Sequence, residues 1–120
     1  MRPPPFSAAS QAAVGAAMDR WDAILETSDE LDVLRVELTK VVDLIDGFPA
    51  VRRALTDPSR SGEDKAQFAT DLLEDTFHPD IVDLVAGMSR SRWSREADIT
   101  RALERIHGVT AVALAERRGE

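Results

Sequence analysis

The segment Pro79–Ser94 constrains the fold of this chain more than any other stretch. Its apolar residues recur at spacings of one to four, so on a helix they cover more than half of the circumference: Ile81, Val82, Leu84, Val85 and Met88. A helix at the surface of a globular protein needs only one apolar stripe, whereas this one needs neighbours on more than one side. The sequence therefore predicts a central helix here, with one face spare for a partner.

Charges mark the two ends of this helix. Pro79 suits a first turn because its missing N–H would have no partner there. Asp80 and Asp83 lie near the positive end of the helix dipole, and Arg90 and Arg92 lie near the negative end. The direction of the helix is thus consistent with its charges.

Length and composition favour one helical core. The chain has 120 residues, about the size of one domain, and 43% of them are hydrophobic although only 5% are aromatic. The apolar residues are mainly Ala, Leu and Val, which favours packed helices over sheets. No strand-like alternation bounded by turns and no fixed-period repeat occurs.

Capping signals place the remaining helices after a stiff, extended lead-in at Arg2–Phe6. Thr27 and Glu30 have the spacing of a capping box, Gly47 suits a left-handed C-cap, and Ser61 with Asp64 resembles a second capping box. Phe68, Leu72 and Leu73 form the expected core face of the fourth helix. We expect an all-α, compact six-helix bundle with helices at residues 7–26, 29–46, 49–56, 62–76, 79–92 and 95–107, the last of which can continue past Gly108 through Val109, Val112 and Leu114.

The first helix has two apolar stripes. The deeper seam, at spacings of four, three and four, consists of Val14, Met18, Trp21 and Leu25. A shallower stripe beside it contains Ala9, Ala13, Ala17 and Ile24. Its small side chains allow another helix to come close; alternatively, the alanines only raise helix propensity.

Charge and residue content exclude several classes of function. The formal charge of −7 and a pI near 4.8 argue against binding to nucleic acid and favour a neutral or basic partner. The sequence contains no Cys, which excludes a disulfide framework and a thiolate nucleophile and fits a cytosolic setting. No run is long enough to span a membrane and no signal peptide is evident, so we expect no direct membrane insertion.

Candidates for catalysis or metal binding are few. His78 lies beside Pro79 and Asp80, a trio that could hold a metal, but a His before a Pro between helices is commonly a turn residue. His107 raises the alternative of a histidine phosphotransfer bundle, although the Lys-Gly pair expected after such a His is missing. We expect no catalytic residue, no cofactor and no metal.

Two stretches go further than periodicity. Residues 55–65, LTDPSRSGEDK, and residues 91–94, SRWS, closely resemble the N-terminal domain of the delta subunit of bacterial F-type ATP synthases, in its actinobacterial form. The mitochondrial counterpart is the oligomycin-sensitivity-conferring protein. The resemblance extends over residues 41–46, 49–55, 82–85 and 98–103.

The resemblance implies a domain organisation and a role. Residues 1–107 would form the N-terminal six-helix domain, and residues 108–120 would complete the last helix and begin a linker to a C-terminal domain absent from this sequence. The family member is a non-enzymatic stator subunit that supports proton-driven ATP synthesis, peripheral at the cytoplasmic face of the cell membrane. Its first and fifth helices hold an N-terminal helix of the alpha subunit, and its contacts with the peripheral stalk b subunit are made mainly through the missing domain.

Applied to this sequence, the resemblance predicts a partner groove between residues 7–26 and 79–92. We expect it to be lined by Ala13, Ala17 and Ile24 from the first of these helices and by Leu84 and Met88 from the second. Two alternatives remain open. Both stripes can be ordinary core, and the chain can be an unrelated helical adaptor or phosphotransfer protein that shares a loop with the family.

Overall fold

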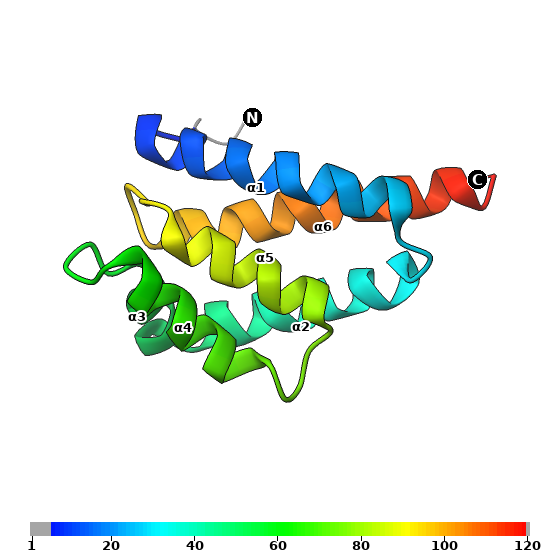
Figure 1. The fold of residues 1–120 in the computed structure, drawn as a ribbon. Coiled ribbons are helices and arrows are strands. Elements are labelled where there is room, and N and C mark those ends of the chain that lie inside the picture. The colour runs from blue at the N-terminus through cyan, green and yellow to red at the C-terminus, as the bar shows by residue number, and fades with distance from the viewer. Residues whose placement is uncertain (1–5, 120) are drawn as a thin grey trace.

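The computed structural model describes residues 6–119. Within that range the chain forms helices and no strands (Figure 1). The helices are α1 (Ala8–Thr27), α2 (Leu31–Gly47), α3 (Pro49–Thr56), α4 (Gly62–Leu73), α5 (Pro79–Arg90) and α6 (Ala97–Arg117). The predicted all-α six-helix bundle is confirmed. Of the extended lead-in predicted at Arg2–Phe6, residues 2–5 lie outside the described residues, and Phe6 is not helical.

Helix α5 occupies the centre of the bundle. It packs against α4 along its length and also contacts α1 and α2, while α6 packs against α2 and α1 (Figure 1). Eight of the twelve residues of α5 are buried, among them all of its Ile, Val, Leu, Ala and Met side chains. The prediction of a central helix is therefore confirmed, but α5 has no broad apolar face left free.

The link between α1 and α2 differs from the predicted capping box. Helix α1 continues through Thr27, and α2 begins only at Leu31. The reason is a local turn in which Ser28 Oγ accepts the N–H of Glu30 at 3.0 Å. The Glu30 carboxylate is then free to leave its own helix end and bond to His78 instead.

The predicted left-handed C-cap at Gly47 is also wrong. Gly47 is the last residue of α2, and the positive φ angle found among the described residues belongs to Gly119. The guanidinium of Arg52 in α3 donates to the carbonyls of Ile45 and Asp46, at 3.5 and 3.2 Å. A side chain from the next helix thus satisfies carbonyls that a left-handed cap would otherwise serve.

Helix α4 begins as predicted and ends early. Ser61 Oγ accepts the N–H of Asp64 at 3.1 Å, which confirms the cap. The helix stops at Leu73 rather than residue 76, and Leu72 is 36% exposed, so its prediction as core is wrong. Ala66 and Ala69 take the buried positions instead, because α4 lies so close to α5 that only small side chains fit over part of the contact.

Helix α6 continues past Gly108 to Arg117, the longer of the two predicted forms. Leu114 is buried, whereas Val112 is 58% exposed. The guanidinium of Arg117 donates to the carbonyls of Leu25 and Ser28 at the end of α1. The linker predicted after α6 stays a prediction.

Two buried hydrogen bonds fix α1 on α6. Ser10 Oγ donates to the Asp98 carboxylate at 2.8 Å, and Trp21 Nε1 donates to Thr110 Oγ1 at 2.9 Å. Each bond joins residues almost 90 positions apart, so no local sequence pattern could have indicated either of them. They determine which face of α1 turns toward the core.

Candidate partner-binding site

The structure buries most of the residues predicted to line the partner groove. Ala17 and Met88 are fully buried and Ala13 is 4% exposed, so the expectation that their stripe faces away from the core is wrong. The reason is that α1 contacts both α5 and α6, and the small side chains permit close approach of the domain's own helices. Ile24 is half-buried, and Leu84 is 5% exposed.

Two of the predicted residues do meet at the surface. Ile24 of α1 and Leu84 of α5 line a cavity of about 230 Å³, which we call the α1–α5 hollow. Its other lining residues are Arg20, Trp21, Asp80 and Asp83. The hollow therefore combines apolar side chains with charged groups of both signs.

Arg20 extends from this hollow across α5. A side chain added at Gly87 would collide with the Arg20 guanidinium, so the absence of a side chain at Gly87 is what allows Arg20 to lie there. Arg20 is exposed and has no carboxylate within ion-pair distance among residues 6–119. Its long stem can cover apolar surface while the charged end stays in water.

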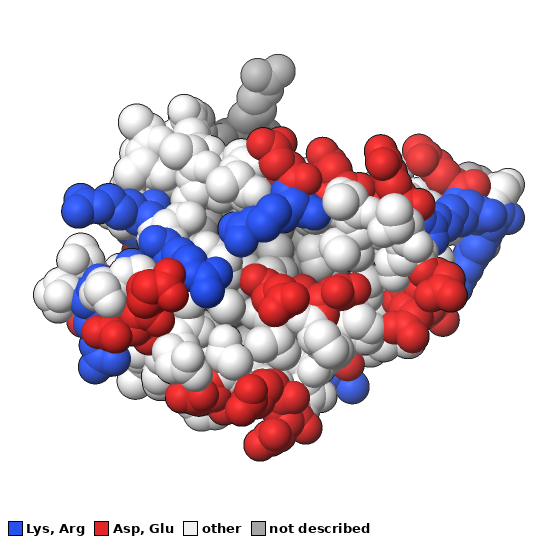
Figure 2. Space-filling model, viewed as in Figure 1, with Lys and Arg blue, Asp and Glu red and all other residues white. Residues whose placement is uncertain are grey.

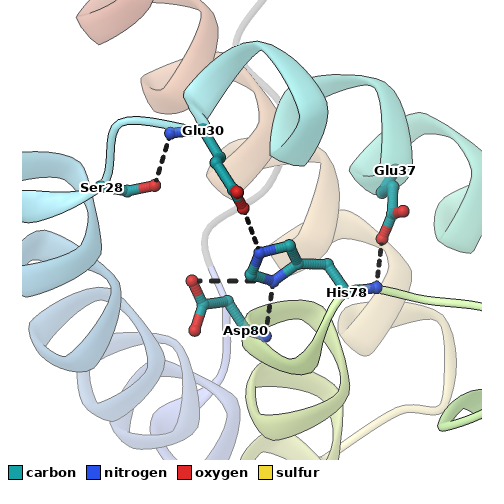
Figure 3. Close-up of polar contacts among 5 residues, drawn as sticks. All are labelled: Ser28, Glu30, Glu37, His78 and Asp80. Atoms are coloured by element: carbon teal, nitrogen blue, oxygen red, sulfur yellow. Dashed lines mark hydrogen bonds and ion pairs between the residues drawn. The ribbon is translucent and has the colours of Figure 1, made fainter.

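A polar cluster closes the N-terminal end of α5 (Figure 3). His78 is the N-cap, and its Nδ1 accepts the N–H of Asp80 at 3.0 Å. Because Nδ1 accepts, the proton of the neutral ring is on Nε2, which lies 2.5 Å from Glu30 Oε2. The backbone N–H of His78 donates to Glu37 Oε1 at 2.6 Å.

The hydrogen bonds of this cluster are those of a helix cap and of a link between helices. Both ring nitrogens of His78 are engaged, and in the described part of the chain no group of three or more His, Asp or Glu side chains is arranged to hold a metal. The turn-residue interpretation of His78 is confirmed. The cluster joins the start of α5 to α2.

His107 lies in the middle of α6 and is half-buried. It lines a cavity of about 160 Å³ with Asp43 and Glu104. Its Nε2 is buried and has no hydrogen-bond partner in the structure. His107 is therefore not on a fully exposed face of α6, which does not favour the phosphotransfer alternative.

The sequence reasoning missed the charged rim of the α1–α5 hollow. Arg20, Asp80 and Asp83 line it, but on a linear pattern they resemble solvated positions. One signal could have located Arg20, since Gly87 interrupts a helix of otherwise larger buried residues and leaves room for a long side chain. As for membrane contact, no helix within residues 6–119 combines the length and apolarity of a membrane span.

Comparison with known proteins complements this geometry. The chain is 45% identical over 114 residues to the ATP synthase subunit delta of Beutenbergia cavernae, and 42% identical over 112 residues to that of Streptomyces coelicolor. These alignments cover 94% and 92% of this chain, and 42% and 41% of the relatives. The chain is related to the N-terminal part of ATP synthase delta subunits.

The delta subunit of Kocuria rhizophila is 38% identical over 102 residues, which cover 85% of this chain and 36% of that protein. No protein-family model matches. The resemblance predicted from the two loop motifs is thereby confirmed. The chain spans about two fifths of the length of these curated delta subunits.

Proposed function

We propose that this chain is the N-terminal domain of a delta subunit of F-type ATP synthase and acts there as a non-catalytic stator component. The similarity to delta subunits over 94% of the chain carries the proposal. In such a complex the domain would be peripheral, at the cytoplasmic face of the membrane. Contacts with the b subunit would be made mainly by the C-terminal part that the longer relatives have.

The proposed partner is an N-terminal helix of the alpha subunit, bound over the α1–α5 hollow. An amphipathic helix can insert apolar side chains beside Ile24 and Leu84 and keep polar groups near Arg20 and Asp83. Ala13, Ala17 and Met88 contribute from beneath, since their burial sets the spacing between α1 and α5. The Arg20 side chain would have to move away from Gly87 for the alpha-subunit helix to extend along α5.

Such a contact suits a stator because it needs no chemistry. Rotary catalysis exerts torque on the catalytic ring, and a bound helix can hold the ring against rotation. Apolar burial contributes roughly 25 cal/mol per Å² before the costs of association are subtracted. Many small apolar contacts over a helix length therefore suffice for a tether.

A peptide-binding experiment tests the proposal. A synthetic peptide of an actinobacterial alpha-subunit N-terminal helix should bind the chain in calorimetric titration. Ile24→Glu should weaken it by about tenfold or more, because a carboxylate would be desolvated in an apolar contact. Val112→Glu adds the same charge at a 58% exposed position on α6 and should leave the affinity unchanged.

Three outcomes would contradict the proposal in different ways. Absence of peptide binding to the unchanged chain would remove the stator function itself. Normal binding by Ile24→Glu would place the site away from the α1–α5 hollow. Equal weakening by both variants would indicate a general charge effect, and circular dichroism should show that each variant retains its helix content.

A further inference from the structure

Another cavity lies at the opposite end of α5 from the His78 cluster. It has a volume of about 320 Å³, and its charged lining residues are four cations and no carboxylate: Arg60, Lys65, Arg90 and Arg92. We call it the basic pocket. In a chain with a formal charge of −7, a cavity whose charged lining residues are all cations is unexpected. Figure 2 shows several Lys and Arg side chains at the end of the molecule where the α3–α4 loop lies, with Asp and Glu side chains beside them and over the rest of this face.

Lys65 is the deepest of these cations. It is 3% exposed, and its Nζ donates to the Ser91 carbonyl at 3.3 Å. No carboxylate in the described chain lies within 4.0 Å of that nitrogen. A buried ammonium group with one neutral acceptor keeps donors free and lacks a counter-charge, which is costly in a folded protein.

The pKa of Lys65 is consistent with this isolation. Burial lowers the pKa of Lys65 below its ordinary value of 10.5; the charge of Asp57 opposes this shift and that of Arg92 adds to it. The surroundings of Lys65 therefore disfavour its protonated form. A bound anion beside the amine would favour the protonated form instead.

The nearest carboxylates have partners of their own. Asp57 accepts the N–H and the hydroxyl of Ser59 at 2.9 and 2.7 Å, and these hydrogen bonds hold the pKa of its carboxyl below the usual value. Glu63 accepts from Arg90 Nε at 3.0 Å. Arg92 forms no ion pair among the described residues, so two cations of the pocket, Lys65 and Arg92, have no ion-pair partner there.

Helix α4 begins at the wall of the basic pocket. Ser61 and Gly62, at its N-terminus, are lining residues, and the first N–H groups of a helix have no carbonyl partner within it. Gly62 lies so close to the backbone of Arg90 that an added Cβ would be 2.9 Å from the Arg90 carbonyl oxygen. The close approach brings the positive end of α4 against the cations at the end of α5.

We propose that the basic pocket binds a small oxyanion of the phosphate class, with Lys65 and Arg92 as its principal ligands. The ammonium group of Lys65 would neutralise it from within, and the planar guanidinium of Arg92 would bind two oxygens from the rim. The volume lies at the lower end of the range for small-molecule sites. The ligand is free phosphate or a small phosphate ester, which share this chemistry.

Thermal unfolding tests the proposal on the chain as it stands. At matched ionic strength, sodium phosphate should raise the Tm above its value in sodium chloride, and the increment should saturate at millimolar phosphate. Phosphate also stabilises proteins in general by exclusion from their surface, but that effect does not saturate. Sodium acetate, tested in the same way, should give no saturable increment.

Matched variants identify the site. The sequence has two lysines, so Lys40→Met removes the same charge as Lys65→Met but at an exposed position on α2. The saturable increment should persist in Lys40→Met and disappear in Lys65→Met. Arg92→Gln, at an exposed position, should weaken phosphate binding at least tenfold in calorimetric titration. If Lys65→Met does not fold, this variant alone tests whether phosphate binds in the basic pocket.

Other results would overturn the proposal. An equal increment in Lys65→Met and Lys40→Met would show that phosphate acts without the pocket, as would unchanged affinity in Arg92→Gln. An equal response to acetate would exclude specificity for phosphate. Titration with glycerol phosphate separates the two sources, since tighter binding than inorganic phosphate indicates an ester and weaker binding indicates the free ion.

Discussion

The two ends of α5 are built from opposite charges and differ in how those charges are balanced. At the N-terminal end, His78 bonds to Glu30 and Asp80 and its backbone to Glu37, so each charged or polar group has a partner within the chain. At the C-terminal end, Lys65 and Arg92 have no carboxylate within ion-pair distance among residues 6–119. The helix dipole explains the sign at both ends. The two ends differ in whether their charged side chains have partners within the chain. Partnered groups hold helices together, whereas cations without an ion-pair partner can bind an anion.

The largest effect on stability should come from adding a side chain at Gly62, where α4 contacts the C-terminal end of α5. Gly62→Ala places a Cβ 2.9 Å from the backbone oxygen of Arg90, and backbone cannot yield easily. We expect a loss of about 1–2 kcal/mol in the free energy of unfolding, the strain being partly offset by the better helix propensity of Ala. Chemical denaturation measures it.

Gly87→Ala is the matched control for that variant. There the added Cβ meets the far end of the Arg20 side chain, which is exposed and can swing away. Its stability should change by less than about 0.5 kcal/mol. Equal losses in the two variants would show that the α4–α5 approach is not tight at Gly62.

An intermediate effect on stability should follow from removing the hydrogen bonds of His78 at the N-terminal end of α5. His78→Ala removes the cap on Asp80 and the bond to Glu30, and we expect a loss of about 1–1.5 kcal/mol in urea denaturation at pH 7. Glu30→Gln keeps a hydrogen-bond acceptor for the ring and should lose less. If His78→Ala is as stable as the unchanged chain, this end is not a fastening and the comparison fails.

The smallest effect should have the opposite sign. Lys65→Met replaces a buried cation by an apolar side chain of similar length, so in phosphate-free buffer the variant should gain about 0.5–1 kcal/mol in unfolding free energy. Because burial lowers the folded pKa of Lys65, the unchanged chain carries its penalty below that pKa and should recover stability as the pH rises from the folded pKa toward 10.5.

That pH dependence can be read by calorimetric melting. The rise in stability at alkaline pH should be missing from Lys65→Met and present in Lys40→Met. A Lys65→Met variant that is less stable than the unchanged chain at neutral pH would mean that the cation stabilises the fold, contrary to its lack of a counter-charge.

The sequence predicted what local contacts decide. Ser61 caps α4 through an N–H three residues away, and that kind of signal is legible in a linear pattern. At Thr27–Glu30 a turn through Ser28 replaces the predicted cap, and the Glu30 carboxylate bonds to a residue 48 positions distant, which no local pattern indicates. Gly47 was mispredicted for a related reason, since Arg52 from the next helix serves the carbonyls.

The site was harder to predict than the fold. The small side chains of Ala13 and Ala17 indicate that another helix packs closely against α1, but not which one. In the structure, helices of the same domain pack there. Likewise, Lys65 follows Glu63 and Asp64 in a pattern typical of a solvated face. Its burial depends on α5 lying over it, which tertiary packing alone decides.

The two tryptophans divide between the two cavities. Trp21 lines the α1–α5 hollow, and Trp93 lines the basic pocket. Both indoles are nearly buried, and each donates a hydrogen bond inside the protein, to Thr110 Oγ1 and to the Met88 carbonyl. Each cavity thus contains its own intrinsic fluorophore. With one indole replaced by Phe, the emission of the remaining indole reports on its own side of the molecule, so binding at the α1–α5 hollow and at the basic pocket can be followed in separate variants without a dye.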